Sequence, residues 1–299
     1  LTAVKANGES YDATRDFSLT VDSDVIKVSK TGMVEPVKNG EAKLKIFHKN
    51  QTSTISVRVT GVSGDFIPDY VRDVMPVLSK LGCNAGTCHG SKAGRNGFKL
   101  SLRGYDPIYD VRAFTDDLAS RRVTIAAPDN SLILLKSSAA VPHEGGQLTK
   151  MGEDYYEILK SWISNGAKLD TGSVRVASIE LFPRNSVVQK IGDQQQMRVI
   201  ATYANGEKRD VTAESFIETG NSDVATTDKT GLVSTERRGE APMLARYEGA
   251  YASTIVTVMG DRSGFEWQDI SANNMVDEFV AAKLKRTKTL SSDLASDEE

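Results

Sequence analysis

Two cysteines and a histidine fall within seven residues of one another and are the side chains best suited to chemistry in this sequence. Cys83 and Cys88 are the only cysteines, four residues separate them, and His89 follows directly. Two thiols can add to the vinyl groups of a haem, and a histidine placed directly after the second thiol can bind the iron. Small and turn-forming residues fill the loop between the thiols, which is longer than the usual two residues. We therefore expect one covalent haem c at Cys83 and Cys88, with His89 as the proximal iron ligand.

Other interpretations of the cluster stay open. The two cysteines could form a structural disulfide at the surface, or they could bind zinc together with His89 and one further residue. Structural zinc sites usually take two pairs of closely spaced ligands, and a second pair is missing from the sequence. A redox Cys-x-x-Cys motif is excluded by the spacing and by the lack of a βαβ pattern around it.

The sequence on either side of the cluster contains a repeat. Residues 23–34 recur as residues 222–233, and Asn7-Gly8-Glu9 recurs as Asn205-Gly206-Glu207. Short alternating apolar runs and turn residues in each copy predict an antiparallel β-sandwich. Only six residues precede the Asn-Gly pair in the first copy, against about 30 in the second. We expect the first sandwich to lack its opening strands.

Helical spacing replaces this pattern between the two copies. Apolar residues recur at intervals of three and four over 71–81 and again over 155–163, so two helices should bracket the cluster. A third amphipathic stretch covers 275–284 and leads into an acidic end at 291–299. The adjacent Arg121 and Arg122 are interpreted as a solvated pair.

The flanks of the cluster resemble those of planctomycete-type cytochrome c domains, with residues 71–83 as the entry helix and 147–167 as the closing helix. The second copy of the repeat resembles bacterial Ig-like domains of group 2. Together with the segment 275–285, the chain is similar to the N-terminal part of large multidomain planctomycete proteins of unknown function. The resemblance implies a multidomain chain with a mainly α c-type cytochrome domain between two all-β Ig-like sandwiches, followed by a helical tail. The expected boundaries are 1–62, 63–172, 173–260 and 261–299.

The same resemblance bears on the second axial ligand of the iron. Related mono-haem cytochromes supply a methionine from a Met-Pro segment before the closing helix, and Val141 stands at that position here. His143 lies two residues further on and is the first candidate for the distal ligand, with Met151 as the alternative. His48 falls within a predicted strand and is expected to be an ordinary strand residue. Because imidazole is a better donor to ferric iron than a thioether, bis-histidine ligation predicts a low reduction potential.

Composition limits the partners. The chain has 37 Lys and Arg against 40 Asp and Glu, spread along its length, which argues against nucleic acid as a partner. Apolar runs are too short to span a bilayer, and the sequence opens at Leu1 without a signal segment, so any targeting sequence is absent from it. We expect an extracytoplasmic protein, in the periplasm or at the cell surface.

Three classes of function remain. The first is electron transfer to a redox partner protein or to a later domain of the parent chain, with no catalytic activity in this part. A second is a haem enzyme or sensor whose labile distal site takes peroxide or a small gas. The third is an adhesion or scaffold protein in which the Ig-like sandwiches carry the function.

Overall fold

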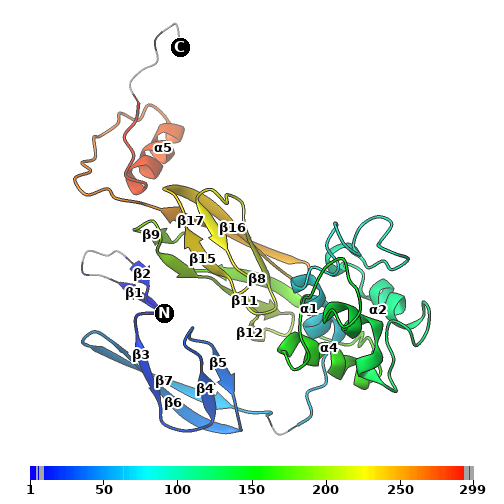
Figure 1. Ribbon diagram of the computed structural model, residues 1–299. Coiled ribbons are helices and arrows are strands. Elements are labelled where there is room, and N and C mark those ends of the chain that lie inside the picture. Colours follow the sequence, from blue (N-terminus) through cyan, green and yellow to red (C-terminus); the bar gives the residue numbers. More distant parts are fainter. Residues whose placement is uncertain (5, 7–9, 63, 293–295, 297–299) are drawn as a thin grey trace.

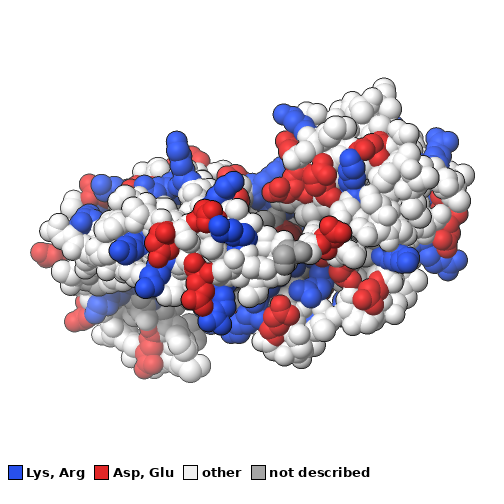
Figure 2. Space-filling model, turned by 90° about the horizontal axis from the view of Figure 1, so that it is seen from below, with Lys and Arg blue, Asp and Glu red and all other residues white. Residues whose placement is uncertain are grey.

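The computed structural model describes residues 1–4, 6, 10–62, 64–292 and 296. Strands form the first part of the chain, short helices and loops follow, a larger set of strands comes next, and one helix ends the described region (Figure 1). Lys and Arg side chains are interspersed with Asp and Glu over the face shown in Figure 2. No helix among the described residues is long and apolar enough to cross a membrane.

The first set of strands forms small antiparallel sheets. The strands are β1 (Thr2–Val4), β2 (Ser10–Asp12), β3 (Ser18–Val21), β4 (Ile26–Val28), β5 (Val34–Pro36), β6 (Gly40–His48) and β7 (Gln51–Val59). They pair in the orders β1-β2, β3-β6-β7 and β4-β5. His48 ends β6, and its Nε2 lies 2.8 Å from the Tyr11 hydroxyl. The turn expected at Asn7-Gly8 lies outside the described residues.

The second set of strands is more extensive. Its members are β8 (Val176–Phe182), β9 (Val187–Val188), β10 (Gln194–Gln196), β11 (Arg198–Tyr203), β12 (Lys208–Asp210), β13 (Phe216–Thr219), β14 (Ala225–Thr227), β15 (Leu232–Thr235), β16 (Gly239–Tyr247) and β17 (Ala250–Val258). The sheets run β13-β16-β17-β9, β12-β11-β8 and β10-β15-β14. Apolar side chains from these sheets meet in one buried core.

The repeat in sequence is also a repeat of strand pairings. Gly40 pairs with Val59 across β6 and β7, as Gly239 pairs with Val258 across β16 and β17. The pairings of β1 with β2 and of β11 with β12 have the same register. Among the described residues the first set has no counterpart of β8, β9 or β10. Ile55 of β7 is 45% exposed, whereas Thr254, the corresponding residue of β17, is 7% exposed.

Short helical pieces lie between the two sets of strands. They are the π-helical turn η1 (Tyr70–Val74), α1 (Met75–Lys80), the 3₁₀ turn η2 (Leu102–Gly104), α2 (Pro107–Thr115), the 3₁₀ turn η3 (Pro128–Asn130), α3 (Leu132–Ser137) and α4 (Asp154–Ser164). Helix α5 (Met275–Arg286) follows the second set of strands. The stretches predicted as helices at 71–81, 155–163 and 275–284 fall on η1 with α1, on α4 and on α5.

The expected fold class is nevertheless wrong. Most of the regular structure is β-strand in several sheets, and the central stretch is not a mainly α cytochrome domain. Turns and loops occupy most of 81–101, 116–131 and 138–153. Glycine recurs in the first and the last of these stretches, and aspartate and serine recur in the second. Such residues favour turns over continued helix because glycine is conformationally free and the short polar side chains bind nearby backbone groups.

The central stretch has its own apolar core and is fixed to the second set of strands. Tyr156, Leu159, Trp162 and Ile163 of α4 are buried against residues of η1 and α1. The Tyr247 hydroxyl of β16 donates a hydrogen bond of 2.9 Å to the backbone carbonyl of a residue in η1. At the end of α1, the Lys80 ammonium donates a hydrogen bond of 2.5 Å to the backbone carbonyl of a loop residue after β12.

Candidate functional site

The two cysteines lie in a tight loop that follows α1. The backbone N–H of Cys83 donates to the carbonyl of Leu78 at 2.9 Å, which ties the first cysteine to the helix. The chain then turns, and the N–H of His89 donates to the Cys83 carbonyl at 3.0 Å. The backbone therefore brings His89 next to the first cysteine as well as the second, and all three predicted haem-binding residues lie in one loop.

Gly90 allows this loop to close. A Cβ atom at this position would lie 2.1 Å from the carbonyl oxygen of Asn84 and 2.9 Å from that of Ala85. The Asn84 side chain is buried, and its amide donates to the Ser79 hydroxyl at 2.8 Å, so this backbone has little room to move. Only glycine fits here without displacing the loop.

One nitrogen of the His89 ring is hydrogen-bonded, and the other is available to bind a metal. Its Nδ1 lies 3.1 Å from the backbone carbonyl of Phe98, and the two ring centroids are 4.7 Å apart. A carbonyl oxygen can only accept, so Nδ1 carries the proton and Nε2 has a lone pair for a metal. Burial lowers the pKa of His89, and the charges of the nearby His143, Arg122 and Arg95 lower it further, against the opposing effect of the Phe98 carbonyl. The neutral ring, which is the form that binds metals, is thus favoured.

After burial, the charge of His143 is one of the smaller causes that lower the pKa of His89. The Nδ1 of His143 is 3.0 Å from the carbonyl of Gly146, so it too must keep its proton on Nδ1 and leave Nε2 available. Gly145 leaves room for the ring in this position, because a Cβ there would lie 2.7 Å from the His143 Cε1 atom. The structure therefore leaves Nε2 available on both histidines that the sequence analysis paired. Met151, the alternative ligand, is 70% exposed in the turn before α4.

The two thiols are free in the structure, and no disulfide joins them. Cys83 packs against the core of the central stretch, and burial, with a smaller effect of the charge on Cys88, raises its pKa to about 12. The thiol form therefore prevails at neutral pH. Within the described part of the chain, no group of three or more histidine, cysteine, aspartate or glutamate residues is placed to hold a metal ion.

The side chains around the loop fit a covalently held haem. Two thiols and an imidazole Nε2 are the donor set that thioether attachment and axial ligation need. A carbonyl that accepts a hydrogen bond from Nδ1 is a contact that commonly orients a metal-binding histidine. Leu102, which is 45% exposed, lies beside Gly86 of the loop and offers apolar surface to a macrocycle.

The partner of His89 was missed by the sequence analysis. Phe98 is nine residues further along, and no local pattern marks its carbonyl as an acceptor. Arg122 was also wrongly interpreted, since it is 7% exposed and its guanidinium lies over the Phe98 ring, 4.6 Å from the centroid.

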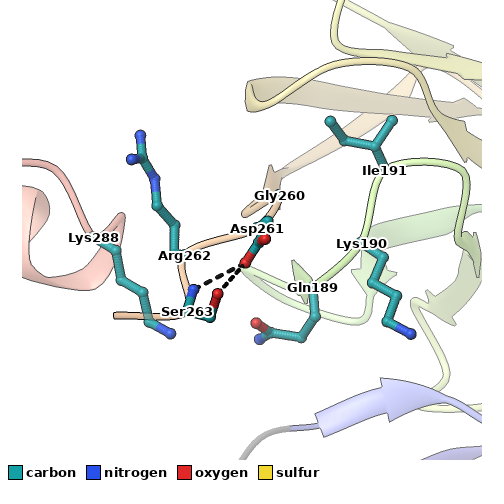
Figure 3. A pocket seen from close by; sticks show the side chains of 8 residues that line it. All are labelled: Gln189, Lys190, Ile191, Gly260, Asp261, Arg262, Ser263 and Lys288. Carbon is teal, nitrogen blue, oxygen red and sulfur yellow. Dashed lines mark hydrogen bonds between the residues drawn. The ribbon is translucent and has the colours of Figure 1, made fainter. Parts of the chain in front are cut away.

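Two hollows of the surface lie elsewhere. One, of about 580 Å³, lies between β9, the segment after β17 and the end of α5 (Figure 3). Its lining residues are Gln189, Lys190, Ile191, Gly260, Asp261, Arg262, Ser263 and Lys288. The other, of about 350 Å³, is lined by residues that include Phe66, Arg72 and Arg209. Neither is lined by Cys83, Cys88, His89 or His143.

Comparisons with solved structures find surface-layer proteins. A crystal structure of the S-layer protein rSbsC(31-844) matches at 11% sequence identity with a TM-score of 0.26, covering 86% of this chain and 22% of that one. Domains 4 and 5 of the S-layer protein SbsC match at 11% identity with a TM-score of 0.25, covering 86% of this chain and 78% of that one. The chain thus spans about a fifth of the longer protein. None of the curated proteins compared with the chain matches it.

One family matches part of the chain. Residues 175–245 match the bacterial Ig-like domain, group 2. The matched residues run from just before β8 to within β16, so the resemblance noted in the second copy of the repeat is confirmed. This part of the protein is a bacterial Ig-like domain of group 2.

Proposed function

We propose that this protein carries one haem c, bound through Cys83 and Cys88 and ligated by His89, and that it transfers electrons. The observation that carries the proposal is the contact between His89 Nδ1 and the Phe98 carbonyl, directly beside the two free thiols. That contact leaves Nε2 as a metal donor in a loop whose thiols could form the two thioether bonds.

His143 is the proposed distal ligand. Its Nδ1 contact with the Gly146 carbonyl gives it the same available Nε2 as His89, and its charge is among the causes that lower the His89 pKa. The exposure of Met151 makes it the weaker candidate. Two imidazole donors stabilise ferric over ferrous iron relative to a histidine and methionine pair, so the proposed centre has a low reduction potential.

The chain's own residues hold and insulate such a centre. A bound haem would supply a one-electron redox centre. The Phe98 carbonyl fixes the His89 ring, and Phe98 itself packs between His89 and Phe114, with centroid distances of 4.7 and 5.2 Å. This aromatic side chain shields one side of the ligand from water, which would otherwise stabilise the more highly charged ferric state.

The surroundings suggest how the centre is used. The contacts of Tyr247 and Lys80 fix the proposed haem-binding stretch on the Ig-like domain, which would serve as a rigid spacer. We propose that electrons pass to or from a redox partner protein, or a later domain of the parent chain, in an extracytoplasmic compartment.

A spectroscopic comparison tests the ligand assignment. The chain is produced together with a haem-maturation system, and absorption spectra and reduction potentials are recorded for the native protein, His143→Ala, His143→Met and the control Met151→Leu. We expect a low-spin ferric spectrum for the native protein and for Met151→Leu, a high-spin spectrum for His143→Ala, and a raised potential for His143→Met.

An unchanged low-spin spectrum in His143→Ala would remove His143 from the site. If the native ferric protein is itself high-spin, its distal position is open, and the spectrum would favour a haem enzyme or sensor for peroxide or a small gas. Loss of the low-spin spectrum in Met151→Leu alone would identify Met151 as the ligand.

A further inference from the structure

Arg122 lies in a buried position that connects two parts of the central stretch. Its Nη2 donates to the carbonyl of Gly97 at 2.7 Å, and its Nη1 donates to the carbonyl of Ala113, near the end of α2, at 2.6 Å. The exposed carboxylate of Asp117 is 3.4 Å from Nη1. The guanidinium therefore bridges a helix and a turn through backbone oxygens, while its face covers the Phe98 ring at 4.6 Å.

The turn that Arg122 holds is the one that orients His89. Residues 95 and 98 exchange backbone hydrogen bonds of 2.8 and 2.9 Å, and the Arg95 guanidinium donates to the Thr87 carbonyl at 3.0 and 3.3 Å. The Phe98 carbonyl accepts from the Arg95 N–H and also lies 3.1 Å from His89 Nδ1. Its position thus depends on the turn, and the turn is anchored by a side chain from 24 residues further along.

We propose that Arg122 is a positioning residue that holds the Phe98 carbonyl against His89 Nδ1 and thereby sets how strongly the imidazole donates to iron. This inference rests on the proposed haem site. A hydrogen bond from Nδ1 to a fixed acceptor increases the basicity of the ring and so favours ferric iron. A looser turn weakens that bond and raises the reduction potential.

The geometry requires arginine and not merely a cation. A guanidinium is planar and has separate N–H groups, so it bonds two carbonyls and stacks on a ring at the same time. An ammonium at this position keeps the charge near His89 but loses the stacked face and the fixed fork. Arg122→Lys therefore separates positioning from electrostatics. Arg121→Lys, one residue earlier and at an exposed position, is the matched control.

The test has two readouts. In the full chain without haem, nitrogen NMR shifts report the histidine tautomers, and the presence of three histidines makes assignment tractable. We expect the Nδ1–H tautomer of His89 in the native protein and in Arg121→Lys, and a mixture of tautomers in Arg122→Lys. In the haem-loaded chain, the potential should rise in Arg122→Lys at unchanged haem content and stay constant in Arg121→Lys.

A single tautomer in Arg122→Lys, together with an unchanged potential, would overturn the positioning role. If the lysine variant does not fold, Arg122→Gln, whose amide can reach one carbonyl, takes its place under the same criteria. Failure of the native chain to attach haem refutes the proposed function instead, and the tautomer measurement on the chain without haem still decides whether Arg122 fixes His89.

Discussion

Replacement of Gly90 by alanine should disrupt the loop that holds both cysteines. The added Cβ would lie 2.1 Å from the Asn84 carbonyl oxygen and 2.7 Å from its carbonyl carbon, which are backbone atoms that cannot rotate away. Overpacking of this kind costs about 1–3 kcal/mol. Displacement of the loop also weakens the hydrogen bond from the Gly90 N–H to the Ala85 carbonyl, which is 3.1 Å long, at about 1 kcal/mol.

The combined loss is about 2–4 kcal/mol. With a urea dependence of about 1–3 kcal/mol per molar, a loss of 3 kcal/mol corresponds to a fall of about 1–3 M in the urea midpoint. Fluorescence of Trp162, which is buried in the core of the central stretch, reports its unfolding. A Trp267→Phe background removes the other tryptophan signal.

Gly86→Ala is the matched control because it lies in the same loop. A Cβ at Gly86 would meet only the Leu102 side chain, at 3.6 Å, which is an ordinary contact. We expect the midpoint of Gly86→Ala to stay within the range of a surface substitution. If Gly90→Ala unfolds at the same urea concentration as Gly86→Ala, the described loop geometry is wrong.

Two further changes test the attachment of the central stretch to the Ig-like domain. Tyr247→Phe removes the donor to the Arg72 carbonyl and leaves the Tyr203 hydroxyl, 2.9 Å from that of Tyr247, without its acceptor. Urea unfolding should show that the free energy of unfolding falls by about 1–3 kcal/mol. An unchanged urea midpoint would contradict the contact. For Lys80, burial lowers the pKa to about 8 from 10.5, so between these values the unfolded chain binds more protons and the free energy of unfolding rises with pH. Lys80→Met lacks this contribution. Between pH 7.5 and pH 10, the free energy of unfolding of the native chain should therefore rise relative to that of the variant. An equal difference between the two proteins at both pH values would refute the burial of Lys80.

The sequence predicted the features that depend on nearby residues. Alternation and turn residues located the two sets of strands, and the spacing of apolar residues over 155–163 located α4. The inference from two helices to a mainly α domain failed. The long segments between those helices satisfy their backbone groups through turns and side-chain contacts, and no periodic pattern records such contacts.

Contacts between residues that are distant in the sequence could not be predicted, for the same reason. Arg122 looks like half of a solvated pair because the carbonyls it binds belong to Gly97 and Ala113, which only the fold brings to it. The acceptor of His89 is a backbone oxygen, and every residue has one, so its identity at Phe98 has no signature in the sequence. The adjacency of Cys88 and His89 was a local signal and could be recognised directly.

Intact mass of the chain produced with a haem-maturation system, combined with a pyridine haemochrome spectrum, tests the central proposal most directly. We expect the mass of the polypeptide plus one haem, retained under denaturing conditions, with a spectrum that indicates two thioether bonds. Loss of the haem and of that spectrum is expected when Cys83 and Cys88 are both replaced by serine. A native mass equal to that of the polypeptide alone would contradict the proposed haem site.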